Sequence, residues 1–156
     1  MIDYVINGLP VHVLLVHLVV IVVPLAALCL LLSAFWPVAR RRLGIVTPIV
    51  ALVGLVAVPF TTAAGEWLQE RVGATPLLER HTTLGPLLLP WVIAVFVVAA
   101  AIWLWYRLDP ALPHALRLAV VVALDAAAIV TSVGSVVLVV LIGESGAAAV
   151  WTGSFL

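Results

Sequence analysis

Long runs of apolar residues, broken by short polar stretches, form the main pattern along the chain. A membrane-spanning helix needs about 20 mainly apolar residues. Four runs reach that length, at about residues 11–36, 45–65, 84–106 and 115–142. The pattern therefore predicts an all-α fold: a single membrane domain, residues 1–156, folded as a transmembrane four-helix bundle.

Threonine, proline and glycine mark the predicted helix ends. Thr47 and Thr75 each precede a proline, so they are candidate N-caps of the second and third helices. The stretch GEWLQERVG predicts a helical extension of the second span that stops at Gly73. Small residues at four-residue spacing on the last span let another helix approach closely: Ala127, Thr131 and Ser135.

The arginines predict how the bundle is oriented, because short cytoplasmic connections carry an excess of positive residues. The connection between the second and third spans holds two arginines, offset by three glutamates. The other two connections hold the remaining five: Arg40, Arg41, Arg42, Arg107 and Arg117. Both termini are therefore predicted on the outer, non-cytoplasmic side of the membrane.

The composition excludes several classes of protein. Of the 156 residues, 66% are hydrophobic and 9% are charged, too apolar for a soluble domain of this size, so the lipid bilayer is the expected partner. The net charge is zero and lysine is absent, which leaves nucleic acid no electrostatic basis for binding. The single cysteine, Cys29, excludes an intramolecular disulfide. Because the N-terminus lacks the basic region of a secretory signal, the first span is expected to be retained.

Ionisable residues gather at the predicted outer ends of the spans, where they more often mark function than chance. The outer layer contains His12, His17, Glu66, His81 and Glu144, whereas His114 falls on the opposite side. His12 and His17 are five residues apart, a rotation of about 140° around a helix, so both cannot face one small ion. Either one of them is the ligand and the other serves an adjacent site, or a larger ligand spans both.

Three interpretations of this layer remain open. One haem b can be ligated by two histidines from different helices, here His81 with either His12 or His17. A single transition-metal ion, Zn, Fe or Cu, is the alternative, with His12, His17, Glu66 and His81 as ligands. In the third interpretation the polar layer only stabilises packing, in a structural or accessory subunit.

Asp125, near the middle of the fourth span, and Glu144 are candidate members of a proton or polar relay. The sequence contains no nucleophile elbow, phosphate loop or metalloprotease helix. It therefore favours an electron-transfer or accessory protein over a stand-alone enzyme. Other redox membrane subunits, or further copies of the chain, are the expected protein partners.

Four motifs, in this order, resemble the bacterial membrane family called domain of unknown function 2231: GLPVHVLLVHLVVIVVPLA, AAGEWLQERVG, LLERHTTLG and GESGAAAVWTG. The resemblance covers almost the whole chain and implies a multi-pass protein of the bacterial inner (plasma) membrane. It also implies that His12, His17, Glu66 and His81 occupy motif positions. Relatives sometimes accompany or are fused to Rieske-type iron–sulfur domains, which implies redox work. Many relatives have Gly-His where this chain has Gly143-Glu144.

Overall fold

The computed structural model describes residues 5–152, and nearly all of them are helical. The terminal residues 1–4 and 153–156, on which the predictions about the two termini fall, lie outside that range. A short antiparallel pair of strands, β1 (Val5–Ile6) and β2 (Leu9–Pro10), opens the fold. The helical elements follow in the order α1 (Val11–Phe35), α2 (Pro37–Leu43), α3 (Val46–Val72), α4 (Pro76–Leu84), the 3₁₀ turn η1 (Gly85–Leu87), α5 (Leu88–Leu108) and α6 (His114–Trp151).

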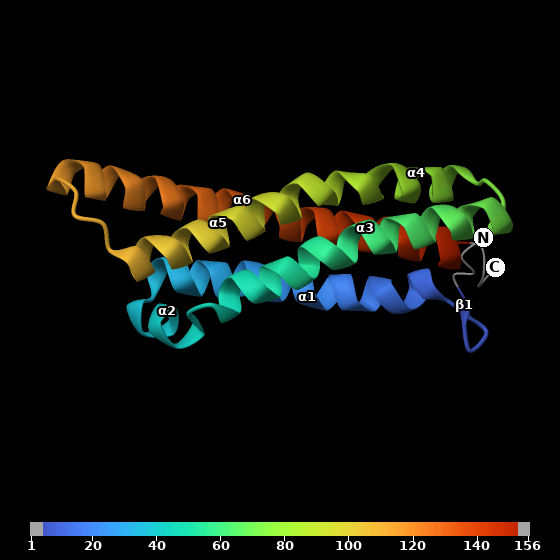
Figure 1. Ribbon diagram of the computed structural model, residues 1–156. Coiled ribbons are helices and arrows are strands. Elements are labelled where there is room, and N and C mark those ends of the chain that lie inside the picture. The colour runs from blue at the N-terminus through green and yellow to red at the C-terminus, as the bar shows by residue number, and fades with distance from the viewer. Residues whose placement is uncertain (1–4, 153–156) are drawn as a thin grey trace.

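Four helical segments of the described chain are long and apolar enough to cross a membrane. They are α1, α3, the continuous stretch from α4 through η1 to α5, and α6. These segments run side by side along one axis (Figure 1). The helix α1 packs against α3 and α6, and α5 packs against the same two helices on the other side. The prediction of an all-α transmembrane four-helix bundle is confirmed.

The two ends of the bundle differ in the residues that they carry. One end holds β1, the turn between α3 and α4, and the last turns of α6; the other holds α2 and the loop between α5 and α6 (Figure 1). We call the first the histidine end, because it carries His12, His17 and His81, and the second the arginine end, because it carries Arg40 to Arg42. That the histidine end faces outward remains a prediction from the arginine distribution.

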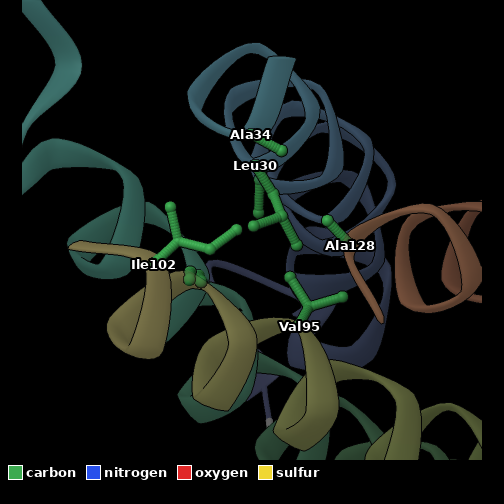
Figure 2. Packing of buried hydrophobic residues seen from close by; sticks show 8 residues of the cluster. Leu30, Ala34, Val95, Ile102 and Ala128 are labelled. Atoms are coloured by element: carbon green, nitrogen blue, oxygen red, sulfur yellow. The ribbon is translucent and has the colours of Figure 1, made fainter. Parts of the chain in front are cut away.

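Small and branched apolar side chains hold the helices together near the arginine end. Leu30 and Ala34 from α1, Val95 and Ile102 from α5, and Ala128 from α6 point toward one another (Figure 2), and all five are buried. The alanines allow the helix backbones to approach closely, which is how helices associate in lipid without a hydrophobic driving force. The small-residue face predicted on the last span is part of this interface, since Thr131 and Ser135 are buried.

A second apolar cluster fills the bundle closer to the histidine end. Its buried members come from every spanning segment: Val19, Val23, Ala57, Val58, Leu88, Val92 and Val139. Between the clusters, the Trp91 ring lies against Gly134 of α6, where a Cβ atom would come within 1.8 Å of the ring carbon Cζ3. Only glycine fits at this contact, because any side chain would overlap the indole.

The predicted helix ends are partly correct. The Thr75 hydroxyl accepts a hydrogen bond from the Leu78 backbone N–H at 3.2 Å, so Thr75 is the N-cap of α4 as predicted. The extension of α3 ends at Val72, followed by Gly73 with a φ of 82°, also as predicted. The prediction for Thr47 is wrong, because α3 begins at Val46 and Thr47 lies inside it. The buried Thr47 hydroxyl hydrogen-bonds Ser33 Oγ at 2.9 Å instead, which joins α3 to α1.

The last helix is longer than predicted. It continues past residue 142 to Trp151, so most of the GESGAAAVWTG motif is helical. Its alanines favour helix strongly, and α4 packs along this part of α6, which provides tertiary support for two glycines inside the helix. The extension brings Ser145 and Gly146 against His81 of α4.

Arg40 closes the end of α1. From α2 it reaches back so that its guanidinium donates to the backbone carbonyls of Ser33 and Ala34, in the last turn of α1. Such carbonyls have no partner within their own helix. The guanidinium carbon also lies 3.5 Å from the centroid of the Tyr106 ring of α5. Arg40 therefore links α1, α2 and α5 at the arginine end.

Gly134→Ala is expected to destabilise the bundle by about 1–3 kcal/mol, because its Cβ would force the Trp91 ring out of place. Gly54→Ala in α3 is the matched control, since its Cβ would meet its nearest neighbours, in Val22 and Val23, at an ordinary 3.6 Å. The measurement is loss of helical circular dichroism on titration of detergent-solubilised protein with sodium dodecyl sulfate. Equal midpoints for the two variants would contradict the tight Trp91 contact.

Arg40→Ala is expected to lower the free energy of unfolding by about 1.5–3 kcal/mol, because two carbonyls lose a charged donor. The neighbouring Arg41→Ala is the control, since Arg41 is exposed on α2 and carries the same charge. The same denaturant titration applies. A loss as large for Arg41→Ala would show that net positive charge matters, and not the capping of α1.

Candidate functional site

A cavity opens at the histidine end of the bundle, between α1, α3, α4 and α6. Its volume is about 770 Å³, within the range of about 300–1,000 Å³ typical of small-molecule sites. Val19, Val58, Leu88 and Val139 line it and also belong to the second apolar cluster, so that cluster forms the floor of the cavity. All three histidines at this end line the cavity, and so does Glu66.

His12 enters the site from the first turn of α1. The chain passes directly from β2 into α1 at Val11, and this placement turns His12 toward α3. Its ring nitrogen Nδ1 donates to the backbone carbonyl of Thr61 at 2.9 Å. The ring is half-buried and packs against the backbone of α3 at Gly65. His12 therefore has a fixed ring orientation set by a neighbouring helix.

His81 enters from α4 and contacts α6 in a similar way. Its Nδ1 lies 3.1 Å from the carbonyl oxygen of Ile142 and 3.1 Å from Ser145 Oγ, so its N–H is shared between these two acceptors. The Ser145 hydroxyl itself donates to Ile142 O at 2.8 Å. The His81 ring is half-buried and lies against Gly146.

The two imidazoles lie beside each other, with ring centroids 6.2 Å apart and planes inclined at 78°. Because each Nδ1 donates its hydrogen, Nε2 carries the lone pair in the neutral ring and is the atom able to bind a metal. Two imidazoles on opposite sides of one metal have centroids roughly 6 Å apart, since each metal–nitrogen bond is about 2 Å and the nitrogen lies about 1 Å from its ring centroid. The observed separation matches that value.

His17 and Glu66 line the cavity without joining this pair. His17 is exposed, and its Nδ1 donates to Val13 O of its own helix at 2.6 Å. Glu66 is exposed on α3, next to Gly65. Across residues 5–152, no three or more His, Cys, Asp or Glu side chains are grouped so that they could hold a metal ion. The four predicted metal ligands thus share a cavity, but they do not form one coordination sphere.

The two candidate relay residues lie away from the histidine pair. Asp125 is half-buried in α6, 17 residues before Ile142, which is about 25 Å along the helix axis. It lies in the electrostatic field of Arg40, at the arginine end. Three buried hydroxyl groups of the spanning helices bond elsewhere: Thr47 to Ser33, Thr131 to Ala127 O and Ser132 to Ala27 O. Glu144 is exposed, and it is not among the residues that line the cavity.

The groups that hold the two histidines were missed by sequence reasoning. They are the backbone carbonyls of Thr61 and Ile142, the Ser145 hydroxyl, and the glycines Gly65 and Gly146. A backbone carbonyl leaves no trace in a sequence. The glycines do leave a trace in the sequence. An isolated glycine inside a helix lowers helix stability by about 1 kcal/mol relative to alanine, so its presence often has a packing reason.

Searches of this chain against family models, curated proteins and solved structures gave no match. The chemistry of the site is therefore inferred from the residues that form it.

Proposed function

We propose that this multi-pass membrane protein binds one haem b between His12 and His81 and passes electrons to or from a redox partner. The observation that carries the proposal is the histidine pair: two imidazoles from different segments, each fixed through Nδ1, with centroids 6.2 Å apart beside a cavity of about 770 Å³. Histidines on facing helices are a normal way to hold a haem in a helical bundle.

The number of donors favours haem over a bare metal ion. A porphyrin supplies four nitrogen ligands to its iron, so the protein needs to supply only the two axial ones. A zinc ion takes about four ligands, three or more of them from the protein. His12 and His81 provide two nitrogen donors, with ring centroids 6.2 Å apart. This arrangement fits the haem better than the alternative of a single transition-metal ion.

The lining of the cavity also suits a flat, largely apolar ligand with polar edges. Its floor of Val19, Val58, Leu88 and Val139 is apolar, whereas Gln69, Thr75 and Thr82 are polar lining residues. A porphyrin ring needs apolar walls, and its propionates need polar groups or water. The valines and leucine supply apolar walls, and the threonine and glutamine side chains add polar groups to the lining.

Electron transfer is favoured over catalysis because both axial positions would be occupied by protein. Bound haem supplies one-electron redox chemistry, and it activates a substrate only where an axial position is open. His12 and His81 would hold the group through their Nε2 atoms, and the bound group would supply one-electron redox chemistry. We therefore propose an electron-transfer or accessory protein and not a stand-alone enzyme.

The resemblance to domain of unknown function 2231 supports the same proposal. It implies a location in the bacterial inner membrane and redox work beside an iron–sulfur protein, with other redox membrane subunits or further copies of the chain as partners. Under this proposal, electrons enter or leave at the histidine end of the bundle.

His12→Ala and His81→Ala are each expected to weaken haem binding more than about tenfold and to abolish the low-spin spectrum of bis-histidine iron, because each removes one axial ligand. The measurement is the visible absorption spectrum of purified protein titrated with haemin in detergent.

Two histidines serve as matched controls in the same titration. His17→Ala and His114→Ala remove imidazoles that do not belong to the pair, so both variants should retain the wild-type spectrum. A folded wild-type protein that stays colourless with haemin would refute the proposal. Stoichiometric Zn, Fe or Cu without porphyrin would favour the metal-ion alternative, and a folded protein binding neither would favour a structural or accessory subunit.

A further inference from the structure

We propose that Gly65 and Gly146 are positioning residues, each of which sets the orientation of one histidine of the pair by leaving room for its ring against a helix backbone. The expected effect of these glycines on haem binding rests on the proposed function. A second readout, the position of the proton on each imidazole, needs no haem.

Gly65 lies directly beneath the His12 ring. A Cβ atom on this glycine would lie 2.9 Å from His12 Nδ1 and 3.0 Å from His12 Cε1. Both distances are well below van der Waals contact, so the ring would have to move away from α3. That movement would lengthen and weaken the bond of 2.9 Å from Nδ1 to Thr61 O, since the same nitrogen makes both contacts.

Gly146 has the same relation to His81. Its Cβ would lie 3.0 Å from His81 Cε1 and 3.2 Å from His81 Nδ1. The same nitrogen bonds to Ile142 O and Ser145 Oγ, so displacement of the ring would weaken both interactions. The contact is slightly looser than at Gly65, which predicts a smaller effect of substitution.

In both helices the glycine follows the accepting carbonyl by four residues: 61 and 65 in α3, 142 and 146 in α6. In an α-helix the carbonyl of residue i accepts from the N–H of residue i+4, and its second lone pair can accept from a side chain. At both sites the imidazole lies close to where residue i+4 would carry its Cβ. Glycine at these two positions therefore leaves room for the ring to bond to the carbonyl.

A neighbouring glycine shows that the need for glycine is confined to the position beside the His81 ring and does not apply to all of α6. Gly143 lies three residues before Gly146, and a Cβ there would meet nothing within 4 Å. The two pairs of elements, α1 with α3 and α4 with α6, thus use the same device to hold their histidines. The structure assigns the same function to both glycines, which is to fix Nδ1 as the donor and leave Nε2 for a ligand.

Gly65→Ala and Gly146→Ala are each expected to weaken haemin binding by about 10- to 100-fold, as is usual when the group that orients a metal ligand is lost. The effect should be larger for Gly65→Ala, and part of the bound haem should convert to a high-spin spectrum. Gly54→Ala in α3 is the matched control and should bind like wild type, since Gly54 does not line the cavity and its Cβ would meet its neighbours at 3.6 Å. Circular dichroism and denaturant titration establish that each variant is folded.

The second measurement is ¹⁵N NMR of the imidazoles in haem-free protein, in a His17→Ala, His114→Ala background where only the pair contributes. We expect Nδ1-protonated rings for both histidines at a pH where they are neutral. In Gly65→Ala the His12 signal should change while His81 keeps its signal, and Gly146→Ala should give the reverse.

The two readouts separate the two proposals. If wild type binds no haem but the NMR signals change as expected, the haem proposal fails and the positioning role stands. If folded Gly65→Ala and Gly146→Ala retain the wild-type NMR signals, the positioning role is overturned, whatever the haem result. An Nε2-protonated His12 or His81 in folded wild-type protein also overturns it, and this test does not depend on whether the alanine variants fold.

Discussion

The hydrogen bond from an imidazole to a backbone carbonyl of a neighbouring helix is the interaction on which the histidine end depends. In an apolar environment a helix satisfies its own polar groups, and a carbonyl that accepts a second hydrogen bond becomes an attachment point for another segment. Thr61 O accepts such a bond from His12 of α1, and Ile142 O accepts one from His81 of α4. The first bond ties the start of α1 to α3, and the second ties the last turn of α4 to α6, while each bond fixes a ring. Stability at this end and the geometry of the proposed ligand site therefore have the same origin.

The spans were predictable because the bilayer constrains their length and their composition. The helix ends were less predictable. Thr75 is a true N-cap, yet Thr47, in the same Thr-Pro context, is buried and hydrogen-bonded to Ser33 instead. A hydroxyl within reach of a second hydroxyl on the facing helix has an alternative to capping, and the local sequence does not reveal that neighbour. The extension of α6 to Trp151 likewise depends on contact with α4, which the fading hydropathy after residue 142 does not reveal.

Counting residues from the predicted membrane ends grouped four site residues on one side of the membrane: His12, His17, Glu66 and His81. In the structure these four residues line one cavity. The helical rotation between His12 and His17 also argued against a simple same-face pair, and the two rings indeed bond to different helices. Which histidine lies beside His81 could not be predicted. That choice depends on the facing carbonyls and on the glycines next to them, so it needs the packing of α1 on α3 and of α4 on α6.

The two apolar clusters have an electrical consequence. Val19 in the cavity floor and Ala34 near the arginine end are separated by 15 residues of α1, or about 22 Å along the bundle axis. The core between them is mainly apolar, with the Ser33–Thr47 hydrogen bond inside it. Such a core is a low-dielectric barrier to ions and protons. Under the proposed function, a redox centre at the histidines would therefore exchange charge with solvent through the histidine end of the bundle. The apolar core would insulate that centre from Arg40 at the arginine end.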